Sequence, residues 1–184
     1  ATYTEKAVEY TVTWMLDATN VHDTKTVAFG TAFPTVTAPS KAGYTFTGWA
    51  PQAPATMPAN NVVITAQWET VPYTITFNLN GGSWPEGTSF ENDKMPYDIE
   101  DDITLPTAIN TTTGQNFGGW QLASDVYGWQ ADTYNGNVGA GKWGDVYLTA
   151  VWTDKPLTVT PNATNGNITV VNDDGKSGNK ANVG

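Results

Sequence analysis

Tyr10-Thr-Val-Thr-Trp14 and Tyr73-Thr-Ile-Thr-Phe77 are two versions of one five-residue pattern, in which large apolar residues alternate with threonine. A period of two with aromatic and β-branched residues is typical of a β-strand that buries one face. Each pattern is followed, later in the chain, by the same further motifs in the same order. The chain is therefore a tandem repeat, and each copy is expected to fold as one small unit.

Two further motifs define the rest of each copy. Phe46-Thr-Gly-Trp49 corresponds to Phe117-Gly-Gly-Trp120, and Thr65-Ala-Gln-Trp68 corresponds to Thr149-Ala-Val-Trp152. The last motif of each copy ends a second alternating stretch, which predicts a closing strand. The glycine before the tryptophan in the first motif predicts a sharp bend, or a close approach of backbone to the ring.

Turn-forming residues and prolines separate these stretches, so the predicted fold class is mostly β, with small tandem modules that hold at most one short helix each. Asn80-Gly81-Gly82 predicts a hairpin turn after the first strand of the second copy. The helix candidates are residues 20–28 and 90–100, and Pro96 disfavours the second. We divide the chain into an N-terminal arm (1–9), module 1 (10–70), module 2 (71–153) and a truncated or divergent third module (154–184).

Composition excludes several classes of function. The 184-residue chain has no cysteine, no basic residue other than its 8 lysines, and a formal net charge of −10 at pH 7. Such acidity disfavours binding to nucleic acid or to an anionic membrane surface. No apolar run is long enough to span a bilayer. Because the last residues read as a module cut short, we expect the chain to be a segment of a longer protein.

Gly43-Tyr-Thr-Phe-Thr-Gly-Trp49, with the Tyr10 pattern before it and Ile64-Thr-Ala-Gln-Trp68 after it, resembles the Listeria–Bacteroides repeat, also called the internalin B-repeat. In module 2, the stretch from Tyr73 to Gly82 is similar to the start of that repeat. The resemblance covers about residues 10–68 and 73–152. It implies β-grasp-like modules, strung together in secreted or wall-anchored bacterial surface proteins. There they serve as spacers or contribute to adhesion, and they are not enzymes.

The two copies differ most between Gln121 and Asp145, where module 2 carries an insert rich in aromatic residues and glycine. Loops inserted into repeats often carry binding sites. Its large aromatic side chains are candidates for stacking on sugar rings, or else they form a mini-core that folds the insert onto the sheet. They are Tyr127, Trp129, Tyr134 and Trp143.

Five other tryptophans lie at matched positions of the two copies. Recurrence at matched positions predicts a role in the core rather than in a binding site, because large aromatic side chains dominate cores. They are Trp14, Trp49, Trp68, Trp120 and Trp152. We expect Trp84, which precedes Pro85 beyond a turn, to be exposed or to lie at an interface between modules.

An acidic patch in module 2 offers the carboxylate oxygens that calcium prefers, or else it is a solvated turn. It consists of Asp98, Glu100, Asp101 and Asp102. Residues 172–175, Asn-Asp-Asp-Gly, superficially resemble a calcium loop, but Val170 and Ala181 would then occupy ligand positions, so the match fails. Calcium is thus a weak candidate, and no other cofactor is expected.

The chain offers no recognisable catalytic constellation. His22 is its one histidine, and without a cysteine or a second histidine it reads as a surface loop residue. A covalent isopeptide cross-link would need a lysine near a strand, such as Lys6, Lys25 or Lys94, but no motif selects a partner for any of them.

These observations predict a non-enzymatic repeat segment of an extracellular bacterial surface or secreted protein, acting as a stalk, a spacer or an adhesion module. The alternative is a module that binds a carbohydrate or host ligand through the insert. A third possibility is a filament subunit, because the incomplete third module offers unpaired strands. Expected partners are neighbouring modules and a host or cell-surface protein or glycan, without nucleic acid or direct membrane insertion.

Overall fold

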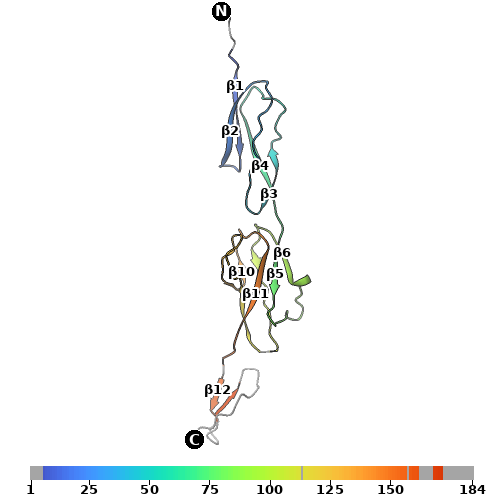
Figure 1. Cartoon of the computed structure of the whole chain (residues 1–184), viewed down its shortest axis with the longest axis vertical. Coiled ribbons are helices and arrows are strands. Elements are labelled where there is room, and N and C mark those ends of the chain that lie inside the picture. The colour runs from blue at the N-terminus through green and yellow to red at the C-terminus, as the bar shows by residue number, and fades with distance from the viewer. Residues whose placement is uncertain (1–5, 113, 157, 162–167, 172–184) are drawn as a thin grey trace, which may run out of the picture. The chain divides into compact units, whose positions relative to one another are not determined.

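A computed structural model describes residues 6–112, 114–156, 158–161 and 168–171 (Figure 1). The chain divides between Val71 and Pro72 into two compact units. The division lies one residue after the boundary placed from the sequence between residues 70 and 71, at Pro72, which restricts the preceding residue to extended backbone. Each unit has its own sheets and its own hydrophobic cluster.

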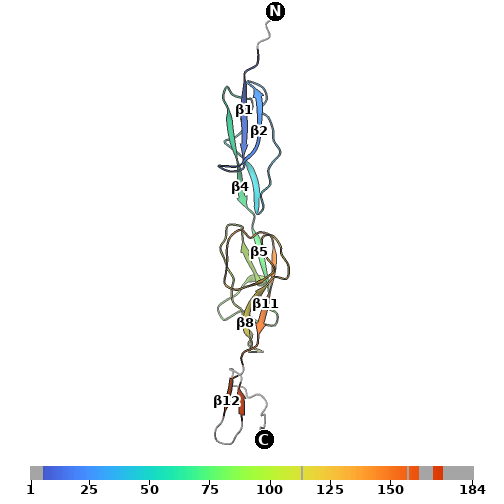
Figure 2. The same ribbon diagram turned by 90° about the vertical axis from the view of Figure 1, so that its left-hand side faces the viewer.

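Module 1 forms one mixed sheet from strands β1 (Glu9–Met15), β2 (Val21–Ala28), β3 (Tyr44–Ala50) and β4 (Val62–Thr70). Their order across the sheet is β2-β1-β4-β3. β1 and β4 lie side by side at the centre and run parallel, whereas β2 and β3 pair antiparallel with them at the two edges (Figure 2). The first and last strands of the module are therefore direct neighbours.

Module 2 repeats this arrangement with β5 (Tyr73–Asn78), β6 (Lys94–Tyr97), β8 (Asn116–Gln121), β9 (Thr133–Tyr134) and β11 (Val146–Thr153). Their order is β6-β5-β11-β8-β9, again with the first and last strands, β5 and β11, parallel at the centre. A small second sheet pairs β7 (Ile103–Thr104) with β10 (Asn137–Val138). The predicted mostly-β fold of small modules is confirmed.

The Phe-x-Gly-Trp motif forms the same β-bulge in both modules. Opposite β4, the register slips between Phe46 and Gly48, so that Thr47 has no partner in the ladder. Opposite β11, the same slip leaves Gly118 without a partner. The glycine after the bulge has φ of 143° in module 1 and 121° in module 2, a region that other residues rarely adopt. The predicted bend is thus a bulge that turns the tryptophan inward.

The tryptophan of each closing strand ties that strand to the end of the first strand. The indole Nε1 of Trp68 donates to the carbonyl of Leu16 at 3.2 Å. The indole Nε1 of Trp152 donates to the carbonyl of the matching residue, Leu79, also at 3.2 Å. Recurrence of the motif therefore preserves a hydrogen bond as well as apolar packing.

The two hydrophobic cores differ in size. In module 1 the buried cluster holds four residues, Val12, Trp14, Met57 and Ile64. In module 2 it holds thirteen described residues, drawn from the main sheet, the small sheet and the insert. Because burial of apolar surface is the main stabilising term, module 2 has the larger share of it.

Neither helix candidate forms an α-helix. Residues 21–28 form β2, which contains four β-branched residues and pairs with β1 from Val21 to Ala28, apart from a bulge at His22. Within residues 90–100 the structure has one 3₁₀ turn, Glu91–Asp93, followed at once by β6. Partners in the sheet thus override the weak helical preference of these short stretches.

The prediction for Trp84 is also wrong. Its ring is partly buried within module 2, 5.4 Å from Phe77, 4.8 Å from Phe90 and 5.6 Å from Trp120. Its indole Nε1 donates to Asp93 Oδ1 at 2.7 Å. The preceding Asn80-Gly81 pair does form a tight turn, closed by Gly82 N–H to Leu79 O at 2.9 Å. That turn leads into a loop rather than a hairpin, and the loop carries Trp84 onto the core.

Beyond module 2, β12 (Thr158–Pro161) pairs antiparallel with β13 (Ile168–Val171). These eight residues are the described portion of the predicted third module after Pro156. Leu157 and the acidic stretch at 172–175 lie outside the described residues.

Candidate ligand-binding surface

The insert of module 2 is folded onto the sheet by short strands at two points. β9 extends the main sheet by pairing Tyr134 with Trp120 and Thr133 with Gln121 of β8. β10 pairs with β7 in the small sheet, and Val138 is buried there. These ladders satisfy backbone groups that a loop of this length would otherwise leave to solvent. The insert is therefore a structured element that presents its side chains in defined positions.

Trp129 belongs to the core of module 2. Its side chain is 1% exposed, and its ring lies 6.0 Å from Tyr97 and 5.3 Å from Tyr134. The Trp129 indole donates to the Tyr97 hydroxyl at 3.1 Å, and that hydroxyl donates to the carbonyl of Gly144. Burial raises the pKa of Tyr97 to about 12. These contacts hold the insert against β6.

Tyr134 is partly buried and its hydroxyl is occupied by contacts within the insert. The hydroxyl donates to the carbonyl of Gln130 at 2.7 Å and accepts from the N–H of the same residue at 3.0 Å. Together with its edge contact to Trp129, this fixes Tyr134 as a support of the core rather than as a surface platform.

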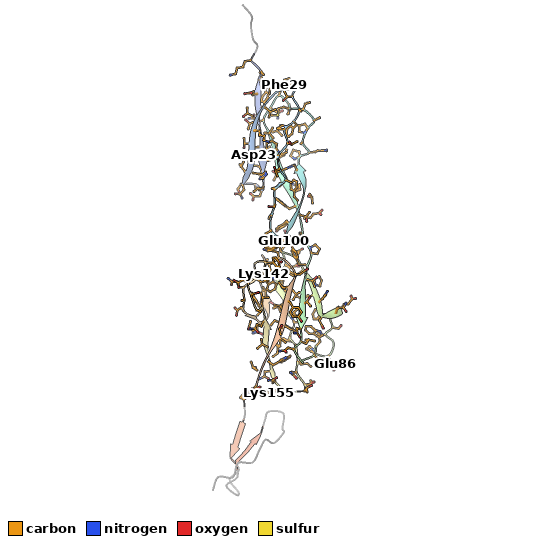
Figure 3. The ribbon with its side chains drawn as sticks, viewed as in Figure 1. Asp23, Phe29, Glu86, Glu100, Lys142 and Lys155 are labelled. Atoms are coloured by element: carbon orange, nitrogen blue, oxygen red, sulfur yellow. The ribbon has the colours of Figure 1, made fainter. Side chains whose placement is uncertain are left out.

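Tyr127 and Trp143 form a separate, outward aromatic pair, with ring centroids 5.0 Å apart. Tyr127 is 48% exposed and occupies a tight turn with Gly128, at φ of 50° and 79°. The backbone N–H of Trp143 donates to the Tyr127 carbonyl at 3.1 Å, and Lys142 Nζ donates to the Gly128 carbonyl at 2.7 Å. Figure 3 labels Lys142, which marks this end of module 2.

Gly144 makes room for this pair. A Cβ at that position would lie 2.3 Å from the ring of Tyr127, so any other residue would displace the ring. The four aromatic residues of the insert thus divide into an inner pair, Trp129 and Tyr134, and an outer pair, Tyr127 and Trp143. The outer pair offers surface to a ligand.

The carboxylates of the acidic patch are used locally to stabilise a turn. Asp101 Oδ2 accepts from the N–H of Asp98 at 2.8 Å, and Asp98 Oδ1 accepts from the N–H of Glu100 at 2.8 Å. Asp102 Oδ1 accepts from the N–H of Ala140 in the insert at 3.1 Å. In the part of the chain that the structure describes, no three acidic, histidine or cysteine side chains are grouped to hold a metal.

His22, considered for catalysis, and Lys25, considered for cross-linking, have structural contacts in module 1. His22 Nε2 lies 3.0 Å from the carbonyl of Thr37, and its ring lies 6.0 Å from that of Trp49. Lys25 Nζ donates to the carbonyl of Thr35 at 2.6 Å and lies 3.9 Å from Asp23 Oδ2 at the surface. That geometry is a weak surface ion pair, not the buried lysine and amide or carboxyl of an isopeptide bond.

The recurring tryptophans occupy two environments. Trp14 and Trp120 are 1% and 0% exposed and lie at the centre of their clusters. Trp49, Trp68 and Trp152 are partly buried at the margins. Each packs edge-on against the phenylalanine of its own module's motif, Phe46 or Phe117.

A polar groove of about 680 Å³ in module 2 was not foreseen from the sequence. Its walls come from the Asn80-Gly81 turn, the segment before β8, the end of β8 and the middle of β11. The lining residues are Asn80, Gly81, Asn110, Thr112, Gln115, Gln121, Thr149, Ala150, Val151 and Trp152. They are scattered over four segments, so no local motif announces the groove. The only clue to the groove in the sequence is that several of these segments contain asparagine or glutamine.

A family model now gives these modules their place among known proteins. The Listeria-Bacteroides repeat domain matches residues 10–67 and 73–151. The chain belongs to this family. The Listeria-Bacteroides repeat is a non-catalytic module typical of bacterial surface proteins. Both matches end with the closing strand, at Gln67 in β4 and Val151 in β11, so the family's unit is the sheet described above.

The Listeria-Bacteroides repeats of this chain contain no membrane-crossing helix among their described residues. The matched ranges contain the repeated strands and the bulge, whereas the indole donors Trp68 and Trp152 lie one residue beyond them. The insert and the polar groove lie in module 2 and are not among the features that the two modules share.

Proposed function

We propose that this chain is a load-bearing spacer segment of an extracellular bacterial surface or secreted protein. The observation that supports the role is the parallel pairing of the first and last strands in each module. β1 pairs with β4 from Val12 with Val62 to Met15 with Thr65. β5 pairs with β11 from Ile75 with Val146 to Asn78 with Thr149.

Parallel neighbours place the N-terminal end of the first strand and the C-terminal end of the last strand at opposite ends of the ladder. Tension that enters through the chain on either side of a module slides the two strands lengthwise past each other. All hydrogen bonds between them are then loaded together, and the module resists until they break as a group. A string of such modules holds its length under tension, which a surface spacer requires.

Single-molecule pulling of the 184-residue chain tests the spacer role. We expect two principal unfolding events, which release segments with contour lengths of roughly 200 Å and 280 Å at about 3.4 Å per residue. The chain has no cysteine, so attachment points can be chosen freely by substitution. A control geometry attaches the chain at Glu9→Cys and Ala28→Cys, which face each other in the antiparallel β1–β2 pair. In this geometry, tension breaks the hydrogen bonds between β1 and β2 one after another.

In this control geometry, module 1 should unfold at a clearly lower force than when the chain is pulled from its termini. Equal forces in the two geometries would contradict a load-bearing role for the parallel ladder. Because forced unfolding is governed by the unfolding rate, the pulling speed must be the same in both.

A second candidate role is adhesion to a host or cell-surface protein or glycan through Tyr127 and Trp143. The supporting observation is that exposed Tyr127 and partly exposed Trp143 form an aromatic pair at a tight turn, since amphipathic aromatic side chains are enriched at binding sites. The test is binding of the chain and of Trp143→Ala to immobilised glycans and cell-surface extracts. Equal binding by both proteins would remove the pair from this role.

A further inference from the structure

The polar groove of module 2 has the dimensions of a ligand site. Its volume of about 680 Å³ lies within the range of about 300–1,000 Å³ typical of sites for small ligands. The groove is lined by Gln121 and Thr149, which face each other in the antiparallel β8–β11 ladder, and by the three residues that follow Thr149 in β11. Its floor is therefore a strand pair of fixed geometry, which favours precise placement of the groups that line it.

The lining of the groove is neutral and rich in hydrogen-bonding groups. None of its ten residues is charged, although the chain carries a net charge of −10. Four side-chain amides contribute, from Asn80, Asn110, Gln115 and Gln121. Each amide carries both donors and an acceptor, and the hydroxyls of Thr112 and Thr149 can do either. Such a surface suits a ligand whose own groups both donate and accept and which has no charge.

Several lining groups are held in place without a ligand. Asn80 Nδ2 donates to the carbonyl of Ala150 at 3.0 Å, and Gln115 Nε2 donates to Asp154 Oδ1 at 2.7 Å. The indole of Trp152 donates to the carbonyls of Leu79 and Asn80 at 3.2 Å and 3.0 Å. Groups that are ordered before binding lose less conformational entropy when a ligand arrives.

Trp152 supplies the groove with a rigid aromatic wall. A Cβ at Gly82 would lie 2.2 Å from Trp152 Cζ2, so the absence of a side chain at Gly82 lets the backbone approach the ring. Phe117 packs against the ring edge-on at 5.7 Å. An aromatic wall beside amides and hydroxyls can meet the C–H groups of a sugar ring while the polar groups meet its hydroxyls.

Module 1 shows what the same framework looks like with other side chains. The repeat alignment places Asp17 at the position of Asn80, Tyr44 at that of Gln115 and Ala50 at that of Gln121. Lys41, at the position of Thr112, lies over the rings of Tyr44 and Trp68 at 3.6 Å and 5.8 Å. A carboxylate, a lysine and a tyrosine thus replace three uncharged groups of the lining, so the neutral groove is a property of module 2.

We propose that the groove bounded by Asn80, Gln121 and Trp152 binds a neutral oligosaccharide. This role is additional to that of a spacer and does not depend on it. It also differs from adhesion through the insert. Lys142, beside Trp143, and Lys155, three residues after Trp152, lie at opposite ends of module 2 (Figure 3). The two surfaces share no residue.

The test is titration of the ¹⁵N-labelled 184-residue chain with cellohexaose, maltohexaose and chitohexaose, each to about 10 mM, enough to detect a Kd of about 1 mM. We expect at least one sugar to shift the indole N–H of Trp152 and the side-chain amide of Gln121. The indole N–H of Trp68, at the matching position of module 1, serves as the internal control and should not move.

Gln121→Ala should weaken binding roughly threefold to tenfold, the effect of losing one neutral hydrogen bond. One matched variant should bind like the parent chain: Gln130→Ala, an exposed glutamine of module 2 outside the groove. Because the parent titration maps the site by itself, the proposal stays testable if a variant fails to fold.

Three results would overturn the proposal. One is the absence of shifts with all three sugars. Another is a set of shifts confined to Tyr127 and Trp143, which would place sugar binding in the insert. The third is a response to a neutral glycine–serine peptide of similar length but to none of the sugars, which would make the groove a peptide site. None of these results bears on the force measurements that test the spacer role.

Discussion

Module 1 and module 2 have sheets with the same central arrangement of strands, but their hydrophobic cores differ. Both have parallel central strands, a bulge before an inward tryptophan and an indole hydrogen bond from the closing strand. The buried hydrophobic cluster of module 1 holds four residues, whereas that of module 2 holds thirteen. The comparison teaches that the repeated residues specify the framework, while unrepeated residues determine the size of the core and the character of the surface.

The two modules also differ in how completely their cores are filled, because module 1 has an apolar groove beside its core. About 310 Å³ of space lies beside Trp14, Trp49 and Ile64, bordered by loop residues around Pro34 and Pro54. In module 2, by comparison, Trp84 and Phe90 come from the loop after β5 and pack against the central aromatic residues. The longer loop of module 2 therefore fills its core more completely.

Replacing the inward tryptophan should have the largest effect, and more so in module 2. Trp120 is 0% exposed, and its indole Nε1 donates to the carbonyl of Pro106 at 2.6 Å. Trp120→Ala should lower the free energy of unfolding of module 2 by about 3–5 kcal/mol. Trp49→Ala should cost module 1 less, because Trp49 is already partly exposed. Urea unfolding of each variant, followed by NMR signals from both modules, measures the two losses.

A larger loss for Trp49→Ala than for Trp120→Ala would show that the small core of module 1 depends on its margin. In that case the buried clusters would not identify the residues that contribute most to the free energy of unfolding of each module.

Substitution of Gly82, a glycine that has no counterpart in module 1, should have the next largest effect. A Cβ at Gly82 would meet Trp152 Cζ2 at 2.2 Å and the carbonyl of Ile109 at 2.7 Å. Gly82→Ala should therefore destabilise module 2 by about 1–3 kcal/mol through overpacking. Gly139→Ala is the matched control, because its Cβ would meet nothing nearer than Asp102 Oδ1 at 4.0 Å. Thermal unfolding compares the two variants, and an equal loss in both would contradict a close approach at Gly82.

Alkaline pH should weaken module 2 through Tyr97. Burial raises its pKa from 10.0 to about 12, so the folded module disfavours the phenolate. Above pH 10 the unfolded chain releases the Tyr97 proton while the folded one keeps it, so stability falls as pH rises from about 10 to about 12. Below pH 10 this contribution is fully present.

The measurement for Tyr97 is the free energy of unfolding of module 2 at several pH values from 9 upward. Tyr97→Phe removes the titrating group, so its stability should fall less steeply over the same range. Identical slopes for the parent and the variant would assign the alkaline loss to other groups.

Sequence alone could predict the framework because the framework is repeated. Alternation of Thr with Val12 or Ile75 specifies a half-buried strand wherever it occurs, and two copies show which positions matter. Residues 21–28 and Trp84 were mispredicted because their structure depends on partners distant in sequence: β1 for the former, Phe77 and Trp120 for the latter. Local preference is too weak to decide such cases.

The insert shows the same limit for the candidate site. Tyr127 and Trp129 are two residues apart, yet one is 48% exposed and the other 1%. The difference arises from a tight turn at Tyr127-Gly128 and from Tyr97, which accepts the Trp129 indole hydrogen bond from 32 residues away. Composition identified the aromatic residues, but only the fold could divide them into an inner and an outer pair.

The smallest effect should come from the outward face of the central strands, where the modules differ in sequence without differing in role. Val63 of β4 and Tyr147 of β11 occupy matched positions, are 57% and 56% exposed, and lie opposite Thr13 and Thr76 of the parallel partner strands. Exchanging them, as Val63→Tyr and Tyr147→Val, should change the free energy of unfolding by no more than about 0.5 kcal/mol, since both residues favour strands and neither is buried. Chemical denaturation of the two single variants measures this. A larger loss for Tyr147→Val alone would mean that the outward face of module 2 is part of its packed structure. The contrast between the modules would then extend beyond their cores.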